Sequence, residues 1–424
     1  MKKTMMIALL LMVAVTFGLY AGGAAETAAK PTTTLELWHI QVNETAKRPI
    51  ENAVRRFEAA NPGVKVNISV IEANPYKTKL KTVTGNDFPD VFHSWGGSWL
   101  ESFVDAGMVA DITEASKAWK DQVSESAFAL NVYDGKVYGS PYMNSSTIMY
   151  YNKDLFKKYN LTPPKTYSEL VQVAETFKKN GIIPFALANQ AKWPGAQHFV
   201  LLSMRLGGPD IFKRAIDGEV KFTDEVFVKA GEMLQDMVKK GYFPEGVNGI
   251  DYNTGGSRVM FYAEQAAMIV QTSNMLSIVK SENPAFYQNK LGVMLYPSIE
   301  GGKGKATDLL AGENAFSVSA YAENKDIAAK LVGFLSTDLQ LMEEYAKGGA
   351  IGASKFAPVP ADDPLLRDAM AQIANATFIQ NFIDQTLAPE LANMHKDTVQ
   401  ALFGGTMTAV QAAQTMQKTA DGLK

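Results

Sequence analysis

The most restrictive stretch of the sequence begins at Tyr133, about a third of the way along the chain. Asp134-Gly135 predicts a two-residue hairpin turn, because the turns that join antiparallel strands need positive φ, which Asp-Gly adopts readily. The β-branched and aromatic residues that follow predict another extended segment. Asn152 or Asp154 can cap a short helix after it. The stretch therefore predicts either a buried hairpin with its connection or a crossover between two lobes.

Length and composition predict a globular chain with more than one domain. The chain has 424 residues, which exceeds the size at which a single core normally stops growing. Its apolar content of 46% and charged content of 20% are those of ordinary globular proteins and argue against disorder. A formal net charge of −3 gives no reason to expect nucleic acid or an anionic membrane surface as a partner.

The first residues predict a secretory signal peptide over residues 1–25. Lys2-Lys3 precede an apolar run that ends at Ala21, and small residues follow. This is the order of a signal peptide, with cleavage expected between Ala21 and Thr27. The alternative is a transmembrane anchor, for which the run is at the short limit of length. No basic stop-transfer cluster follows the run, which favours cleavage.

The chain contains no cysteine. It can form neither a disulfide nor a thiolate metal site, and it has no cysteine to which a lipid could be attached. Together with the predicted signal peptide, this favours a soluble periplasmic protein without a lipid anchor.

Periodicity along the chain predicts an α/β fold. Residues 35–39 have the pattern of a strand, apolar residues within 50–57 recur at helical spacing, and residues 64–70 alternate strictly, as in a strand with one buried face. This strand–helix–strand order is the start of an α/β domain. Thr166-Tyr-Ser-Glu169 and Thr408-Ala-Val-Gln411 are capping boxes, which predict the starts of two further helices.

The chain resembles the family 1 extracellular solute-binding proteins of ABC importers, the group that includes maltose-binding protein. Segments similar to those of the family follow one another in the same order over almost the whole chain after the signal peptide. They include Leu37-Trp38-His39, Asn61-Pro62-Gly63, Phe88-Pro-Asp-Val-Phe92, the hairpin with Tyr150-Tyr-Asn-Lys-Asp-Leu-Phe156, Lys192-Trp193-Pro194, Arg205-Leu-Gly-Gly208, Ala266-Ala-Met268, Ala311-Gly312 and Lys330-Leu-Val.

The resemblance implies a two-lobed periplasmic binding protein of the type II fold, with α/β lobes and a ligand cleft between them. We expect the first lobe to comprise residues 32–143 plus 300–348 and the second to comprise 144–299 plus 349–424. About three crossover segments would join the lobes. The resemblance also implies a carbohydrate ligand, a membrane permease as partner, a monomer, and no cofactor.

Three tryptophans are candidates for the ligand site. Trp95 and Trp99 follow a predicted strand and are separated by two glycines and a serine, and Trp193 lies in a predicted loop, residues 191–195. Ligands of open α/β sheets bind outside the carboxyl ends of strands, and the apolar face of a sugar ring packs well on an aromatic side chain. The alternative is that these tryptophans belong to the core, as most do.

Polar residues near the same predicted cleft complete the candidate site. Amides and carboxylates can bind sugar hydroxyls, although each can also cap a helix or lie in a solvated loop. The candidates are Asn43 and Glu44 after the first strand, Tyr142 and Asn144 at the proposed crossover, Gln197 and His198 after Trp193, and Glu313 and Asn314 before a late strand.

Asn274 is the one clear departure from the family pattern. Relatives commonly have Gly-Ser-Trp after the Ala-Ala-Met strand, where the tryptophan stacks on the ligand. Here the segment is Gln271-Thr-Ser-Asn274, so an amide occupies the tryptophan's position. The resemblance therefore does not specify which sugar is bound.

Enzymatic and metal-binding patterns are weak in this sequence. The four histidines lack metal-ligand spacing, and no Gly-x-Ser-x-Gly elbow occurs. Ser277-Ile-Val-Lys280 matches the Ser-x-x-Lys of penicillin-binding enzymes without its partner motifs. A glycoside hydrolase needs two opposed carboxylates, and nothing singles out such a pair. We predict a binding protein without metal; a secreted carbohydrate-active enzyme, or a binding protein for a polyamine or an anion, are the alternatives.

Overall fold

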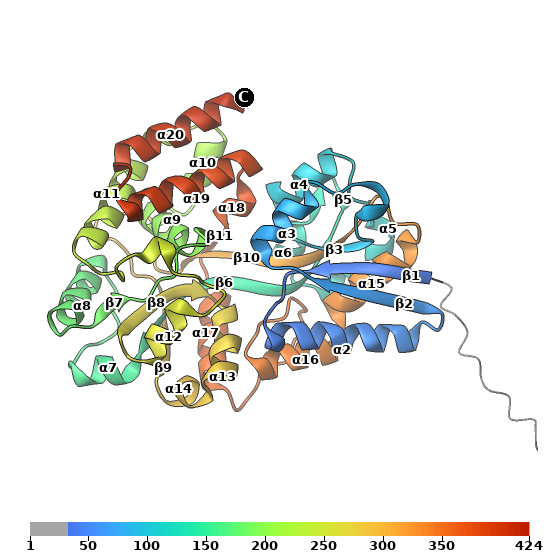
Figure 1. The fold of residues 1–424 in the computed structure, drawn as a ribbon, viewed down its shortest axis with the longest axis horizontal. Helices are drawn as coiled ribbons and strands as arrows, with labels where there is room; N and C mark the ends of the chain where they lie inside the picture. The colour runs from blue at the N-terminus through green and yellow to red at the C-terminus, as the bar shows by residue number, and fades with distance from the viewer. Residues whose placement is uncertain (1–32, 424) are drawn as a thin grey trace, which may run out of the picture.

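The computed structural model describes residues 33–423, so the predicted signal peptide, residues 1–25, lies outside the described residues. Figure 1 shows two lobes side by side, joined by long strands that run between them. Within the described range, every helix is too short or too polar to span a bilayer.

The first lobe contains the N-terminal elements and two late helices. Its elements are β1 (Thr33–His39), α2 (Glu44–Ala60), β2 (Val64–Val70), α3 (Ala73–Leu80), β3 (Val91–Ser94), α4 (Ser98–Asp105), α5 (Thr113–Ser116), α6 (Glu125–Ala129), β4 (Val132–Tyr133), β5 (Lys136–Val137), α15 (Lys325–Thr337) and α16 (Leu339–Gly348). Strand β1 pairs in parallel with β2 and with β3, α2 packs on β2, and α15 and α16 pack on α2, which makes this an α/β lobe.

The second lobe contains the middle of the chain and its C-terminal helices. Its elements are α7 (Lys153–Lys158), α8 (Tyr167–Lys179), β7 (Ile183–Phe185), α9 (Trp193–Gly207), α10 (Ile211–Ile216), α11 (Glu225–Lys239), α12 (Gly256–Tyr262), β8 (Ala266–Thr272), α13 (Asn274–Glu282), α14 (Pro284–Asn289), β9 (Leu291–Met294), α17 (Pro364–Ala374), β11 (Phe378–Asn381), α18 (Ile383–Thr386), α19 (Pro389–Gly404) and α20 (Ala409–Gly422).

Two long strands, β6 (Ser140–Asn152) and β10 (Asp308–Val318), connect the lobes (Figure 1). They pair with each other and complete one sheet in the order β2-β1-β3-β10-β6-β8-β7. Tyr142 on β6 belongs to the first lobe's core, whereas Met149 on the same strand belongs to the second lobe's core. On β10, Phe316 belongs to the first lobe's core and Leu310 belongs to the second lobe's core. Both strands therefore pass from one core to the other.

The local turn and capping predictions are confirmed. Asp134 and Gly135 have positive φ, 50° and 74°, and join β4 to β5 as a hairpin. Thr166 and Thr408 each form a complete capping box, at the starts of α8 and α20. Asn152 caps α7 by accepting hydrogen bonds from two backbone N–H groups. The extended segment predicted after the hairpin is the second half of β6, a longer strand than expected.

The change of core along β10 lies later in the chain than the predicted boundary at residue 300. Arg205 of α9 is buried, and its guanidinium donates to four backbone carbonyls, those of Tyr296, Pro297, Ala306 and Asp308. A Cβ at Gly302 or Gly304 would collide with backbone carbonyls of α9. These contacts hold residues 296–308 on the second lobe.

Residues 350–354, just after the predicted boundary at residue 349, contact the cores of both lobes. Ala350 and Ala353 belong to the first lobe's core, and Ser354 donates from its hydroxyl to the carbonyl of Gln122. Leu366, in α17, belongs to a core cluster of the second lobe. Ile351 belongs to the same cluster as Leu366, so residues 350–354 lie at the junction of the two lobes.

Candidate functional site

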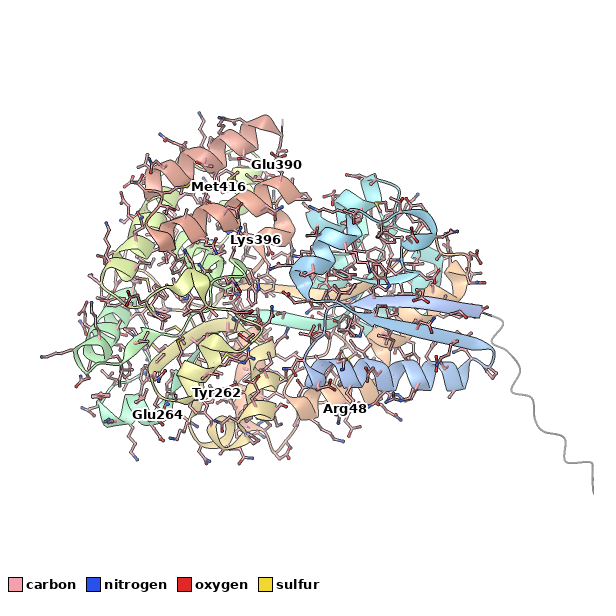
Figure 2. The ribbon with its side chains drawn as sticks, in the orientation of Figure 1. Arg48, Tyr262, Glu264, Glu390, Lys396 and Met416 are labelled. Atoms are coloured by element: carbon pink, nitrogen blue, oxygen red, sulfur yellow. The ribbon has the colours of Figure 1, made fainter. Side chains whose placement is uncertain are left out.

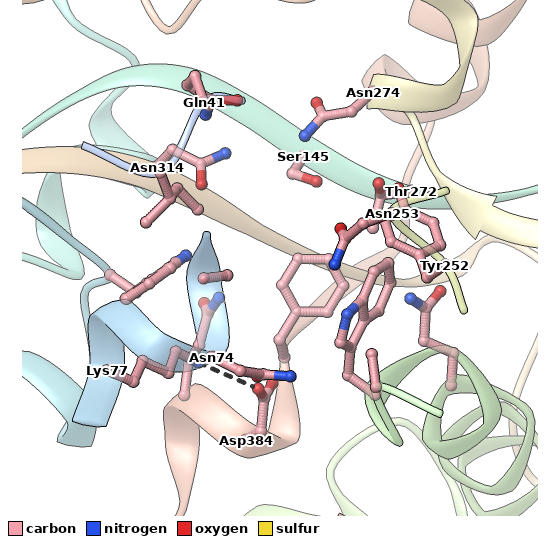
Figure 3. Close-up of a pocket in the computed structure, with 18 of the residues that line it drawn as sticks. Gln41, Asn74, Lys77, Ser145, Tyr252, Asn253, Thr272, Asn274, Asn314 and Asp384 are labelled. Atoms are coloured by element: carbon pink, nitrogen blue, oxygen red, sulfur yellow. Dashed lines mark ion pairs between the residues drawn. The ribbon is translucent and has the colours of Figure 1, made fainter. Parts of the chain in front are cut away.

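A cavity lies between the lobes, where the crossing strands form its floor. The space within its lining, open solvent included, is about 1510 Å³. Figure 3 shows side chains converging on it from both sides, with Asn74 and Lys77 of α3 opposite Tyr252 and Asn253 of the second lobe. Ser145 of β6 and Asn314 of β10 lie between these walls.

Trp95 forms part of the first wall and is held from several sides. It is 5% exposed, and its ring centroid lies 4.5 Å from that of His93 and 4.9 Å from that of Trp99. The Lys77 Nζ lies 4.3 Å from the ring centroid, within range of a cation–π contact. Trp99 does not line the cavity; it lies in the first turn of α4 and packs inward on Phe103, with ring centroids 4.6 Å apart. Trp99 is therefore a core residue, which was the alternative to a role in the ligand site.

Trp193 forms part of the opposite wall and is partly exposed. The predicted loop around it was wrong: Trp193 is the first residue of α9, after Lys192 with φ of 68° and before Pro194, which suits a first helical turn. Tyr252 packs against it in an edge contact, with ring centroids 4.8 Å apart.

Polar side chains surround Trp193 on the second wall. Gln197 lies one turn further along α9, lines the cavity and accepts a hydrogen bond from the Thr147 hydroxyl at 2.9 Å. Asn274 begins α13 and also lines the cavity; its Oδ1 has no hydrogen-bond partner among the described residues. His198 points away into the core beside Phe185 and Phe243, where burial lowers its pKa to about 3.

Tyr142 and Asn144 lie outside the cavity, while their neighbours Met143 and Ser145 line it. Alternate residues of a strand point to opposite faces, so the prediction chose the wrong face of β6. Tyr142 still bears on the site, because its hydroxyl accepts a hydrogen bond from the Gln41 Nε2 at 2.8 Å. Gln41 lines the cavity, and Tyr142 orients it from behind.

The two candidates that follow β1, Asn43 and Glu44, have different surroundings. Asn43 lines the cavity, but its Oδ1 already accepts hydrogen bonds from the backbone N–H and the hydroxyl of Thr45, as the N-cap of α2. Glu44 does not line the cavity: it is exposed and pairs with Lys47 one turn along the helix. Asn43 is therefore a helix cap and Glu44 is a solvent-exposed side chain, which are the two alternatives given for these residues.

An ionic cluster crosses the cavity. Asp384 of α18 lies 3.5 Å from the Lys77 Nζ, drawn as a dashed line in Figure 3, and 3.9 Å from the Lys396 Nζ. Lys396 stands on α19, near the junction of the lobes (Figure 2). Burial alone would raise the pKa of Asp384, but the two lysines hold that pKa below its usual value. The cluster thus links α3 of the first lobe to α18 and α19.

Glu313 and Asn314 both line the cavity from β10. The register of β10 against β6 shifts after Asn314, and such a bulge re-aims side chains locally. Glu313 is 1% exposed, and its Oε1 accepts hydrogen bonds from the Gly96 N–H at 2.6 Å and the Asn131 Nδ2 at 3.3 Å. Burial raises the pKa of Glu313 to about 8, against those hydrogen bonds.

The cavity thus brings together seven of the predicted residues and several that the sequence did not indicate. The seven are Trp95, Trp193, Asn43, Gln197, Asn274, Glu313 and Asn314; the others are Glu44, Tyr142, Asn144, Trp99 and His198. The added residues are Gln41, Asn74, Lys77, Tyr252, Asn253, Asp384 and Lys396. Asn74 and Lys77 could have been found from their place in the chain, because they closely follow the strand predicted over residues 64–70.

Within residues 33–423, no group of three or more histidine, aspartate or glutamate side chains is placed to hold a metal ion. The cavity lining is instead a set of aromatic rings, amides and one ionic cluster. Such a surface can pack the apolar faces of a ligand and hydrogen-bond to its polar groups.

Comparisons with known proteins give a consistent result. A family model described as bacterial extracellular solute-binding protein matches residues 39–340. A solved structure from work on xylan utilization by Caldanaerobius polysaccharolyticus is 32% identical, with a TM-score of 0.85 over 91% of this chain and 99% of that one. A solved chitin oligosaccharide binding protein is 25% identical, with a TM-score of 0.83 over 92% and 98% of the two chains. The galactooligosaccharide-binding protein of Bacillus subtilis is 24% identical over 97% of this chain and 96% of its own.

Proposed function

Because this chain belongs to the bacterial extracellular solute-binding proteins, we propose that it is the substrate-binding component of an ABC transporter for a carbohydrate. The observation that carries this proposal is the cavity between the lobes, with Trp95 on one wall and Trp193 on the other. Amide side chains stand between and beside the two rings. The protein would deliver the sugar to membrane permease subunits and perform no chemistry on it.

The cavity lining suits a sugar. The C–H face of a sugar ring is apolar and packs on an aromatic ring, while its hydroxyls need donors and acceptors. Gln41, Asn253 and Asn274 offer amides for that purpose. The relatives described above include proteins named for oligosaccharides, which supports this class of ligand.

We propose an oligosaccharide in preference to a single sugar. The two tryptophans stand on different lobes, so a ligand that contacts both must span the cavity. A xylo-oligosaccharide is the first to test, because a relative 32% identical comes from work on xylan utilization.

The proposed mechanism is closure of the lobes around the ligand. We propose that the chain passes between the lobes within β6, within β10 and between residues 350 and 364. A ligand stabilises the closed state only by its higher affinity for that state, which here comes from contact with both walls. We also propose that the mature protein is a periplasmic monomer, exported by a signal peptide and not lipidated.

A thermal-shift screen tests the proposal. The panel contains xylotetraose, galacto-oligosaccharides, chitin oligosaccharides, single sugars, polyamines and anions. A ligand present at about 100 times its dissociation constant should add about 2.7 kcal/mol to the free energy of unfolding. Stabilisation by a sugar that is recovered chemically unchanged supports the proposal. Conversion of the sugar to product would favour a carbohydrate-active enzyme, and stabilisation by amines or anions alone would favour a different solute.

A further inference from the structure

Glu313 is a carboxyl group at the floor of the cleft that makes no salt bridge within residues 33–423. It lies on β10 between β3 and β6, 1% exposed, and lines the cavity. The lysines of the cavity face another acid, since Lys77 and Lys396 both approach Asp384. A buried carboxylate without a cationic partner is strongly disfavoured.

The two oxygens of Glu313 have different surroundings. Oε1 accepts hydrogen bonds from the Gly96 N–H and from Asn131. Glycine is needed at position 96, because a Cβ there would lie 2.7 Å from that oxygen. Oε2 is buried and has no hydrogen-bond partner among the described residues. An oxygen that accepts two N–H bonds has no room for a proton, so the proton of the neutral acid belongs on Oε2.

We propose that Glu313 binds the carbohydrate as a neutral carboxylic acid, in which Oε2–H donates a hydrogen bond to an uncharged oxygen of the sugar. This inference rests on the proposed function and assigns one contact within it. A buried donor without a partner is unfavourable, so a sugar with an acceptor at this point is selected over an analogue that lacks one. The raised pKa of about 8 is consistent with a protonated acid at neutral pH.

Other titratable groups surround Glu313. Tyr133 and Tyr142 have pKa values raised by burial and further by the charge of Glu313, and burial lowers the pKa of His93. The remaining charged or titratable groups of the cavity are Glu72, Lys77, Tyr252, Asp384, His395 and Lys396. A comparison of the natural protein with Glu313→Gln at each pH cancels their contributions, because both proteins contain them.

The binding experiment uses calorimetric titration between pH 6 and pH 9. The probe is xylotetraose, or the panel sugar with the largest thermal shift if xylotetraose gives none. Glu313→Gln keeps the shape, an acceptor for Gly96 and a donor in place of Oε2–H. We expect its affinity at pH 7 to lie within about threefold of the natural protein's. The natural protein should weaken above about pH 8, toward tenfold per pH unit, while Glu313→Gln stays constant.

Glu72→Gln is the matched control, because it neutralises another glutamate of the same cavity. Its affinity relative to the natural protein should be the same factor at every pH. Two results would overturn the inference. One is a loss of tenfold or more in Glu313→Gln with affinity of the natural protein rising with pH, which would show a carboxylate acceptor. The other is an affinity of the natural protein that does not change across this range.

A measurement without ligand separates this inference from the proposed function. A carboxyl group whose pKa is higher in the folded than in the unfolded state costs stability as pH rises between those two values. The melting temperature of the natural protein should therefore fall relative to Glu313→Gln between about pH 4.5 and pH 8, with no further change above. Equal pH profiles would refute the neutral acid even if sugars bind. A growing difference without any sugar binding would remove the proposed function instead.

Discussion

The two walls of the cleft hold their tryptophans in opposite ways. Trp95 is buried to 5% exposure between His93 and Trp99, with a lysine over its face. Trp193 is partly exposed on the first turn of α9, with one close ring neighbour, Tyr252. A ring that is packed on several sides supports the fold as well as the cleft. The first wall is therefore fixed by packing around its tryptophan, whereas Trp193 on the second wall is held by fewer contacts.

Replacing Trp95 should have the largest effect on stability. Trp95→Ala removes a buried ring and leaves a cavity, so we expect the free energy of unfolding to fall by about 3–5 kcal/mol. Urea unfolding followed by circular dichroism measures this change. Trp95→Phe, which keeps a smaller ring, is the control and should lose less. A loss below about 1 kcal/mol for Trp95→Ala would show that the first wall is not fixed by packing.

Asp384→Asn tests the contact between the two walls. The substitution leaves Lys77 and Lys396 without their shared carboxylate, and we expect a loss of about 2 kcal/mol at pH 7, between the values for exposed and buried pairs. The pKa of Asp384 is lowered in the fold. Its contribution is therefore present above the unfolded pKa of about 3.9 and is lost as pH falls through the folded value.

The pH dependence supplies the check on that assignment. Melting temperatures of Asp384→Asn and the natural protein should differ at pH 7 and converge in acid. Lys47→Gln, which breaks an exposed pair with Glu44, is the control and should change the melting temperature little. A difference that is the same at pH 7 and in acid would mean that the ion pairs contribute nothing.

Trp193→Ala should separate binding from stability. We expect a loss of about tenfold in sugar affinity, about 1.4 kcal/mol, because the stacking surface is removed. The free energy of unfolding should change by less than about 1 kcal/mol, since the ring is partly exposed. Calorimetry and urea unfolding measure the two quantities, with Trp193→Phe as control. Unchanged affinity would remove the second wall from the binding site.

Asn274→Ala should give the smallest effect. Asn274 lines the cavity and its buried Oδ1 has no hydrogen-bond partner among the described residues, so we expect a loss of about 0.5–1.5 kcal/mol in binding, or a few-fold in affinity. Stability should stay the same, because the amide oxygen makes no hydrogen bond within the described residues. Asn274→Asp, which keeps the oxygen, should bind more tightly than Asn274→Ala; the opposite order would place the ligand elsewhere.

The sequence predicted what local rules govern. The Asp134-Gly135 hairpin and the capping boxes at Thr166 and Thr408 depend on a few neighbouring residues, and all three formed. The family pattern predicted the two-lobed α/β fold, because that pattern also depends on the order of short segments along the chain. Trp193 was misplaced into a loop because Pro194 and Gly195 are common both in loops and in first helical turns.

What the sequence missed depends on contacts between distant residues. Lys77 and Asp384 meet although some three hundred positions separate them, and no local pattern marks either one. Tyr142 and Asn144 were chosen without knowing which face of β6 would meet the cleft, and a shift of one residue exchanges the faces. Trp99 points inward because it lies in α4, which begins at Ser98. The two glycines before Ser98 did not show where this helix would begin.

The lobes are connected by two paired strands, β6 and β10, so a rotation between the lobes would twist this pair. Residues 140–146 and 311–316 form a hydrogen-bonded ladder where the chain changes core. A ladder of this kind twists elastically, whereas a single-chain linker swings freely. Any rotation between the lobes must wind or unwind it, and the bulge after Asn314 is the place where it yields most easily. Under the proposed closure, the two strands whose side chains line the cleft would also limit how far the lobes rotate.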